Sequence, residues 1–423
     1  MLSDWLGFAA VTALLIALIA LVLHSPLPRP LRLLLSAALL LRLVGATARY
    51  LVLFSFYGGM GDAVIYYREG LVFAERFRAL DLSPIWDPTF WHFANSWWGT
   101  QFVVFPSGIV LSMLGSSILG EFVAFSLLGF AGLVAFAVAF HRSSPHVPVT
   151  RYARWIWLFP SLWFWPSSVG KEALILCGLG LAVLGFVGKH GRVQWLLSTI
   201  GVALIMAIRP QVAAVVLFAF ILAQWLGLGE RWTLGRLVQT MLILSVGIVA
   251  IRYSLGALGV ETFDVEGVQG YVESQSGRKA GGGSVFTGVD VGLRGVPLAM
   301  LYVLVRPFPW EAGNPMVLVS SLEMVGFWAL VWIRRRTLLQ SLRRCRSNRL
   351  LRLCVPMVLL YSAMLGMSVT NLGIVARQRI FLFPFLFALL EAVPLASRAL
   401  PEPGPLPMRH RPRTMAVAGG ALR

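Results

Sequence analysis

Long apolar runs dominate this sequence, and they leave few folds open to it. Several windows of about 20 residues hold few or no charged side chains, and a helix of about that length crosses a bilayer core of about 30 Å. Only 13% of the residues are charged, about half the share typical of soluble domains. Because the bilayer core offers no water to pair with backbone groups, such runs fold as helices. The sequence therefore predicts an all-α polytopic membrane protein.

About 11–12 transmembrane helices are predicted from these runs. The windows are 5–23, 33–56, 121–140, 152–166, 170–188, 194–208, 211–228, 237–256, 316–333, 353–370 and 380–396, and a further apolar stretch covers 101–118. The first window lacks a basic leader and a small-residue cleavage site, so we expect it to remain as a membrane span. We expect one integral membrane domain over 1–400 and a disordered basic tail at 401–423. No internal repeat is visible, which argues against the inverted-repeat plan of many transporters.

The excess of positive charge indicates how the chain is oriented. Lys and Arg number 36 against 18 Asp and Glu, and the densest basic run, 334–352, lies between two apolar windows. Cytoplasmic loops carry such an excess and anionic lipid head groups attract them, so we favour this interpretation over nucleic-acid binding. The same rule places 141–154, 189–192, 229–236 and the tail on the cytoplasmic side. The three cysteines show neither metal-ligand nor disulfide spacing.

Two long segments are expected on the extracytoplasmic side. The first, 57–100, has aromatic residues at helical spacing and is predicted to lie along the membrane interface as short amphipathic helices. The second, 257–297, is polar and rich in glycine, as in a mobile loop over a site. If the first is outside and 121–140 returns to the cytoplasm, 101–118 cannot be a simple crossing. Either that stretch is re-entrant or one of the predicted spans is wrong.

A pair of opposite charges, Lys171 and Glu172, stands between two apolar runs, directly after Pro166, Ser167 and Ser168. A charge at membrane depth costs about 2.5–3.5 kcal/mol on insertion scales, so its presence needs a reason. A serine cap and the helix dipole account for Glu172, whereas a cation is disfavoured at a helix start. Lys171 is therefore predicted to face an anion, which free N–H groups there would help to bind. Ser168 is a candidate sugar contact.

Four outer helix ends carry cationic side chains at comparable predicted depth. They are Lys171, Arg209, Arg306 and the pair Arg377 and Arg379. Arginine makes bidentate contacts with phosphate oxygens and lysine supplies a point charge, so a phosphate-binding site is predicted where these ends meet. The alternative is that each arginine reaches lipid phosphates independently. Glu311, five residues after Arg306, is a candidate sugar contact.

Asp62 is the candidate acid or base. It follows a predicted span and a glycine-rich stretch, and Tyr66, one helical turn onward, is a candidate sugar contact. The Asp62 carboxylate could deprotonate an acceptor hydroxyl, bind a divalent metal or cap the interfacial helix. His92 and the loop histidines show no metal-ligand spacing. Arg42 lies within an apolar window and needs a partner, for which Glu323 is the candidate in a structural ion pair.

The order of these motifs resembles a group of bacterial membrane proteins. In chain order the motifs are "GDAVIYY", "FPSLWFWPSSVGKEAL", "IRP", "RPFPWEA" and "ARQR". From about residue 55 to 385, the chain resembles polytopic proteins encoded with exopolysaccharide genes. These are similar in plan to O-antigen polymerase-like repeat-unit polymerases, and to integral-membrane glycosyltransferases that use polyprenyl-phosphate sugars.

The resemblance implies a GT-C-like glycosyltransferase that assembles a cell-surface polysaccharide from polyprenyl-(pyro)phosphate-linked sugars. Arg209, Arg377 and Arg379 would match the arginines that hold the lipid phosphate, and Asp62 would match the base. The predicted catalytic residues are Asp62, Lys171 and Glu172. The polymerases that the chain resembles do not generally need a metal, so no metal and no other cofactor is predicted. The expected location is the bacterial cytoplasmic membrane, with the lipid-linked sugar and polysaccharide assembly proteins as partners and no role for nucleic acid.

Two alternatives to the enzyme remain open from the sequence. One is a transporter or flippase of lipid-linked oligosaccharide, and the other is a non-catalytic partner in a polysaccharide-export assembly. Transporters usually carry charges midway through their spans and show internal symmetry. Here the charges cluster at outer helix ends, which favours the enzyme.

Overall fold

The structure, a computed structural model, describes residues 2–91, 97–188, 191–227, 295–369 and 371–393. The regular elements in these ranges are helical. In chain order they are α1 (Leu2–His24), α2 (Arg29–Leu51), the π-helical turn η1 (Val52–Phe56), α3 (Asp62–Arg78), η2 (Ser83–Ile85), η3 (Pro88–Phe90), α4 (Thr100–Leu114), α5 (Ile118–Ser143), α6 (Val149–Leu158), α7 (Pro160–Phe164), α8 (Lys171–Val187), α9 (Arg192–Ile208), α10 (Pro210–Trp225), α13 (Val296–Val305), η5 (Pro309–Glu311), α14 (Pro315–Ile333), α15 (Arg335–Arg343), α16 (Arg349–Ser368), α17 (Leu372–Gln378), η6 (Arg379–Phe381) and α18 (Phe383–Glu391). The predicted span 237–256, nearly all of the predicted loop 257–297 and the predicted tail 401–423 lie outside the described residues.

Several of these helices have the length and composition of membrane spans. Within the described ranges, five are long and apolar enough to cross a bilayer: Trp5–His24, Arg29–Phe56, Ile118–Ser143, Pro315–Ile333 and Arg349–Ser368. A sixth span would join α17 and η6 to α18 across a bend of 54°. Shorter apolar helices are Thr100–Leu114, Arg192–Ile208, Pro210–Trp225 and Val296–Val305. The chain thus has the architecture of an all-α membrane protein, as its composition predicts.

The predicted spans that fall within the described residues coincide with helices, although two of them are broken. The window 152–166 is divided into α6 and α7 at Pro160, which has no N–H to continue the helix. The window 380–396 begins at the bend that precedes α18. Helix α13 has no counterpart among the predicted spans, because its 10 residues are too few to stand out as a membrane window.

Close contacts at glycine hold the centre of the bundle together. A Cβ added at Gly132 of α5 would lie 2.2 Å from the carbonyl oxygen of Leu176 on α8, and one at Gly178 of α8 would lie 2.8 Å from the carbonyl oxygen of Gly201 on α9. Membrane helices favour such small-residue contacts, because lipid tails are as apolar as side chains and close packing drives association instead. Helix α8 is therefore held tightly between α5 and α9, which fixes the position of its first turn.

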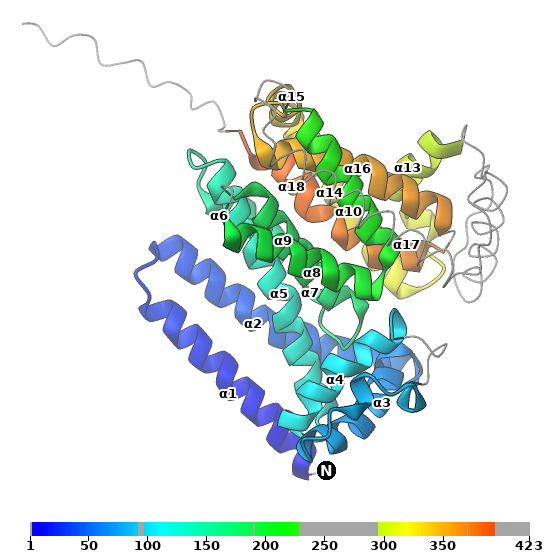
Figure 1. Cartoon of the computed structure of the whole chain (residues 1–423). Helices are drawn as coiled ribbons and strands as arrows, with labels where there is room; N and C mark the ends of the chain where they lie inside the picture. The colour runs from blue at the N-terminus through cyan, green and yellow to red at the C-terminus, as the bar shows by residue number, and fades with distance from the viewer. Residues whose placement is uncertain (1, 92–96, 189–190, 228–294, 370, 394–423) are drawn as a thin grey trace, which may run out of the picture.

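One end of the bundle collects basic segments that were predicted to be cytoplasmic. The buried carboxylate of Glu391 pairs with Arg151 at 2.6 Å and with Arg334 at 3.5 Å. These contacts bring the segment 141–154 together with 334–352, and Figure 1 shows α15 at this end of the molecule. The second segment is not a plain loop, since α15 and the start of α16 lie within it. The two segments share one end, as the charge pattern predicts, and the side of the membrane that this end faces stays a prediction.

Helices α3 and α4 lie side by side at the opposite end, where Figure 1 also shows the N-terminus. A Cβ added at Gly70 of α3 would meet the Ser107 hydroxyl of α4 at 2.1 Å. Helix α4 begins at Thr100 and ends at Leu114, whose carbonyl group lies against Gly7 near the start of α1. With 15 residues, α4 is shorter than the about 20 residues that a simple crossing needs. The apolar stretch that the sequence left unplaced thus forms a short helix packed against α3.

The predicted ion pair between Arg42 and Glu323 is wrong. Both side chains instead form hydrogen bonds with residues on either side of the helix break at Pro160, Arg42 from α2 and Glu323 from α14. Arg42 is fully buried and donates to the carbonyl oxygens of Trp157 at 2.9 Å and Leu162 at 3.2 Å. Glu323 accepts hydrogen bonds from the Ser161 N–H, at 2.7 Å, and from the Ser161 hydroxyl. A broken helix leaves buried backbone groups without partners, and that need is stronger here than the attraction of the two charges for each other.

We expect Arg42→Lys to lower the thermal stability of the protein. A lysine side chain at this position could not reach the carbonyl oxygens of both Trp157 and Leu162, because it lacks the planar fork of arginine. Each carbonyl left without a donor should cost about 1–3 kcal/mol in the free energy of unfolding. The check is the melting temperature in detergent, compared with that of Arg29→Lys, an exposed arginine on the same helix. Equal melting temperatures for the two variants would contradict the proposed role of Arg42.

Candidate functional site

Four helix ends that are far apart in the sequence meet at one place. Asp62 opens α3, Glu172 lies in the first turn of α8, Arg209 joins α9 to α10, and Arg377 lies near the end of α17. The local sequence produces these ends. Gly61, before Asp62, has a φ of +151°, a backbone conformation that residues other than glycine rarely adopt. The proline after Arg209 starts a new helix. The structure brings the helix ends 171–172, 209 and 377 together, as predicted, and their shared binding role stays a prediction.

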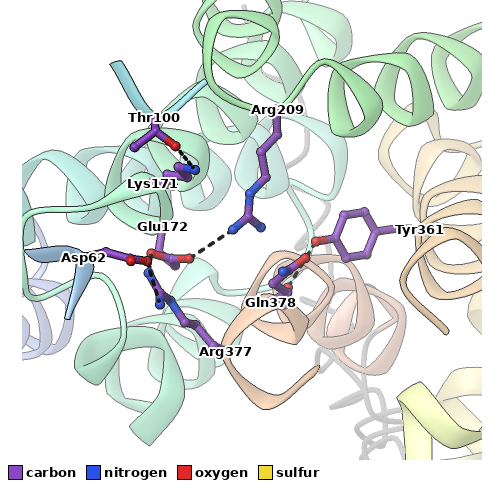
Figure 2. Close-up of polar contacts among 8 residues, drawn as sticks. All are labelled: Asp62, Thr100, Lys171, Glu172, Arg209, Tyr361, Arg377 and Gln378. Atoms are coloured by element: carbon purple, nitrogen blue, oxygen red, sulfur yellow. Dashed lines mark hydrogen bonds and ion pairs between the residues drawn. The ribbon is translucent and has the colours of Figure 1, made fainter. Parts of the chain in front are cut away.

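Glu172 is the centre of this cluster. Its carboxylate accepts a hydrogen bond from Arg377 Nη2 at 2.7 Å through Oε2, and Oε1 lies 3.5 Å from Arg209 Nη2 (Figure 2). The Glu172 side chain is only 3% exposed, so its charge would be costly without these cations. Nη1 of Arg209 is buried and has no hydrogen-bond partner among the described residues. A buried guanidinium with a spare donor can accept a further anionic partner.

Lys171 and Asp62 lie on different sides of this carboxylate. Nζ of Lys171 donates to the Thr100 hydroxyl of α4 at 2.9 Å, and in Figure 2 it lies away from Arg377. Asp62 Oδ2 lies 3.8 Å from Nη1 of Arg377, and the Asp62 side chain is 63% exposed. Arg377 therefore bridges a buried carboxylate and an accessible one.

A cavity of about 550 Å³ opens beside Arg377, within the range of small-molecule sites. Its charged lining comes from Arg49 of α2, Asp62 and Arg377. Arg49 donates to the Ser168 hydroxyl at 3.3 Å, and its guanidinium lies 5.2 Å from the ring centroid of Trp165. The remaining lining includes Leu53, Tyr57, Met60, Val169, Asn314, Met316, Asn371 and Gly373.

The charge of the cavity and its surroundings favours anions. The cluster holds four cations and two carboxylates, namely Arg49, Lys171, Arg209 and Arg377 with Asp62 and Glu172. A formal excess of two positive charges thus remains at one end of a membrane bundle. Guanidinium groups in a partly desolvated site bind phosphate oxygens through charge-assisted hydrogen bonds. The accessible Asp62 carboxylate on the same wall could accept a proton from a bound hydroxyl.

The other two predicted phosphate-binding arginines are held elsewhere. Arg379 is buried and donates to the carbonyl oxygens of Val303, at 3.1 Å, and Arg306. Arg306 forms an ion pair with Glu311. Burial alone would raise the pKa of Glu311, but hydrogen bonds from Arg306 and from the N–H of Phe308 lower it overall. These side chains do not line the cavity and organise the turn after α13 instead.

Tyr66 is also outside the cavity lining, although it lies one turn after Asp62. Its side chain is 1% exposed. Burial, together with the nearby carboxylates of Asp62 and Glu172, raises the pKa of the Tyr66 phenol above its ordinary value. The phenol of Tyr66 therefore stays protonated, and its side chain lies on the buried face of α3. Among the described residues, no three His, Cys, Asp or Glu side chains gather in a way that could hold a metal ion.

Sequence reasoning missed several side chains of the site. Arg49 lies seven residues after Arg42 in the same apolar window, and nothing in the sequence distinguishes their roles. Asn314 and Asn371 could have been found as caps, since each accepts hydrogen bonds from backbone N–H groups at a helix start. Thr100, the partner of Lys171, is the last residue of the predicted interfacial segment 57–100, directly before the stretch that the sequence could not place.

Comparison with known proteins finds no matching family model, no matching curated protein and no matching solved structure. The function must therefore be argued from the geometry of the site.

Proposed function

We propose that this protein is a membrane glycosyltransferase or polymerase that assembles a cell-surface polysaccharide from polyprenyl-(pyro)phosphate-linked sugars. The observation that carries the proposal is that Arg49, Arg377 and Asp62 all line the same cavity. Cations that could hold a phosphate and a carboxylate that could accept a proton are the two groups that such a transfer needs. Their place at one end of an apolar helical bundle suits a substrate anchored in the membrane.

The geometry supports the following reaction. Arg49 and Arg377 would bind the lipid (pyro)phosphate and stabilise the charge that develops as the bond between the sugar and the phosphate oxygen breaks. The hydroxyl of the acceptor sugar would attack the anomeric carbon to form the new glycosidic bond, and its proton would pass to Asp62. Glu172 would act as a positioning residue, because it holds Arg377 and Arg209 in place.

The wider arrangement that we propose is that of a polytopic GT-C-like protein with about 11–12 transmembrane helices in the bacterial cytoplasmic membrane. The described spans and shorter apolar helices support part of that number. The end of the bundle that carries the site would face the extracytoplasmic side, since the basic segments gather at the other end. Proteins of polysaccharide assembly or export are the expected partners.

The proposal can be tested in cells that lack the gene. Complementation with the wild-type protein should restore long surface polymer, whereas Arg49→Ala should restore little, because loss of a charge-assisted contact weakens phosphate binding about 10–100-fold. Arg29→Ala, a change to an exposed arginine at the other end of the same helix, is the matched control. Short lipid-linked units should accumulate in the outer leaflet of deficient cells.

Other outcomes would point to other functions. Lipid-linked units trapped in the cytoplasmic leaflet would indicate a flippase. Polymer that is normal in the absence of the gene would contradict any role in polysaccharide assembly, and restoration by Arg49→Ala to the wild-type level would separate the cavity from the function. Membrane levels of each variant, measured by immunoblotting, show whether a deficit reflects activity or amount.

A further inference from the structure

A second cavity, of about 170 Å³, adjoins the charged one. It lies between α7 and α14. The lining residues are Pro160, Ser161, Trp163, Phe164, Trp165, Met316, Val319, Ser320 and Glu323. Trp165 and Met316 line both cavities, so the two lie on either side of these side chains.

The chemistry of the second cavity is the opposite of that of the first. Aromatic and aliphatic side chains make up most of its lining. Its carboxylate, Glu323, is already engaged, because both oxygens accept hydrogen bonds from Ser161. Arginines line the first cavity, whereas none lines the second. The pair of cavities therefore fits a ligand that is anionic at one end and apolar at the other.

The second cavity follows a face of a membrane-spanning helix. From Met316 to Glu323 it runs along eight residues of α14, roughly 10 Å at the helical rise. Val319 lines the cavity and is 56% exposed, and Leu322 and Val325 on the same helix are 59% and 55% exposed. Because this helix has the composition of a membrane span, these apolar side chains would face lipid in a bilayer. The cavity would then border the bilayer.

We propose that the cavity between α7 and α14 holds the first isoprene units of a polyprenyl phosphate whose phosphate lies between Arg49 and Arg377. This inference rests on the proposed function and adds where the lipid lies and from which side it enters. A phosphate and the first units of its hydrocarbon chain are joined covalently, so they need adjacent polar and apolar cavities that share a wall. Trp165 and Met316 provide that wall.

The cavity would position the lipid rather than supply affinity. Hydrocarbon gains little on passing from a bilayer into an apolar groove, because lipid tails are as apolar as the lining. Blocking the groove should therefore act by steric exclusion of the chain, and it should leave the phosphate site intact.

The test uses the purified full-length protein in proteoliposomes and an undecaprenyl phosphate analogue with a diazirine in the isoprene unit next to the phosphate. In the wild-type protein, light should attach the probe to peptides of α7 and α14. Val319→Trp should reduce labelling at least five-fold. Val325→Trp places the same bulk on an exposed position of the same helix outside the cavity, and it should not change labelling. The Val319 side chain is mostly exposed, so the larger side chain should not disturb the fold, and the melting temperature of the variant verifies this.

Competition distinguishes the lipid source and separates the two proposals. An excess of unlabelled undecaprenyl phosphate should abolish labelling, whereas an equal excess of phosphatidylglycerol should not. Equal competition by both lipids would show that bulk phospholipid fills the groove and would overturn this inference alone. Labelling of the peptide that contains Arg377 but not of α7 or α14 would also overturn it while supporting the phosphate site. If unlabelled undecaprenyl phosphate reduces labelling at no site in the protein, both proposals are overturned.

Discussion

Asp62→Asn is expected to lower the rate of glycosyl transfer by about 10²–10⁴-fold, the usual contribution of a general base. The amide keeps the size of the carboxylate but cannot take the proton of an acceptor hydroxyl. Stability should change little, because the Asp62 side chain is 63% exposed and its contact with Arg377 is long, at 3.8 Å. The measurement is the initial rate of transfer in proteoliposomes, with binding of the donor lipid determined separately.

Two further variants make this result specific to Asp62. Glu75→Gln makes the same chemical change on an exposed carboxylate of the same helix, 13 residues or about 20 Å along its axis, and it should transfer sugar at the wild-type rate. Asp62→Glu keeps the carboxylate and should retain part of the activity. A wild-type rate for Asp62→Asn would show that this residue acts only at the start of α3, as a capping or structural group.

Glu172→Gln is expected to destabilise the protein by about 3 kcal/mol, the lower part of the range for a broken buried pair. The amide would leave Arg209 and Arg377 close together without an anion between them. Their side chains are 15% and 29% exposed, so water would screen the repulsion only in part. We expect inorganic pyrophosphate to raise the melting temperature of this variant more than that of the wild type. An anion bound only by the folded state stabilises by about 2.7 kcal/mol at 100 times its Kd.

The control for this prediction lies at the other end of the bundle. Glu391 is also a buried carboxylate between two arginines, Arg151 and Arg334. Glu391→Gln should destabilise the fold by a similar amount, but pyrophosphate should not restore it, because neither arginine lines the charged cavity. Equal restoration of both variants would mean that any pair of freed arginines binds the anion. The cluster around Glu172 would then be a structural ion network.

The helix positions could be read from the sequence because they depend on local chemistry. Apolar windows mark the spans, and the proline at 210 marks a break that the structure also shows. The break at Pro160 was not predicted, since 152–166 was expected to be one span. The breaks also indicate where backbone groups need partners, but not which side chains supply them. Arg42 and Glu323 were expected to pair because both are charged residues within spans. The structure assigns each to the same helix break instead.

Neighbouring arginines show why the site could be predicted only in part. Arg377 and Arg379 are two residues apart in one short motif, yet Arg377 lines the charged cavity and Arg379 binds carbonyl groups after α13. Two residues along a helix point about 200° apart, so one of them must face away from whatever the other contacts. The same uncertainty applies to Arg42 and Arg49, which differ in depth along one helix. The sequence identified the residue types and helix ends but not the direction of each side chain.

By itself, then, the sequence determined that this is an all-α membrane protein and placed cations and carboxylates at helix ends. Those conclusions rest on hydrophobic length, backbone hydrogen bonding and the cost of charge in a bilayer, which act over a few turns of helix. Only the tertiary structure decided that Glu172 lies against Arg377, which is 205 residues away in the chain, and that Arg49 joins them. Contacts of that kind depend on how whole helices pack. Packing at residues such as Gly132 and Gly178 is set by the shapes of both partners and not by either segment alone.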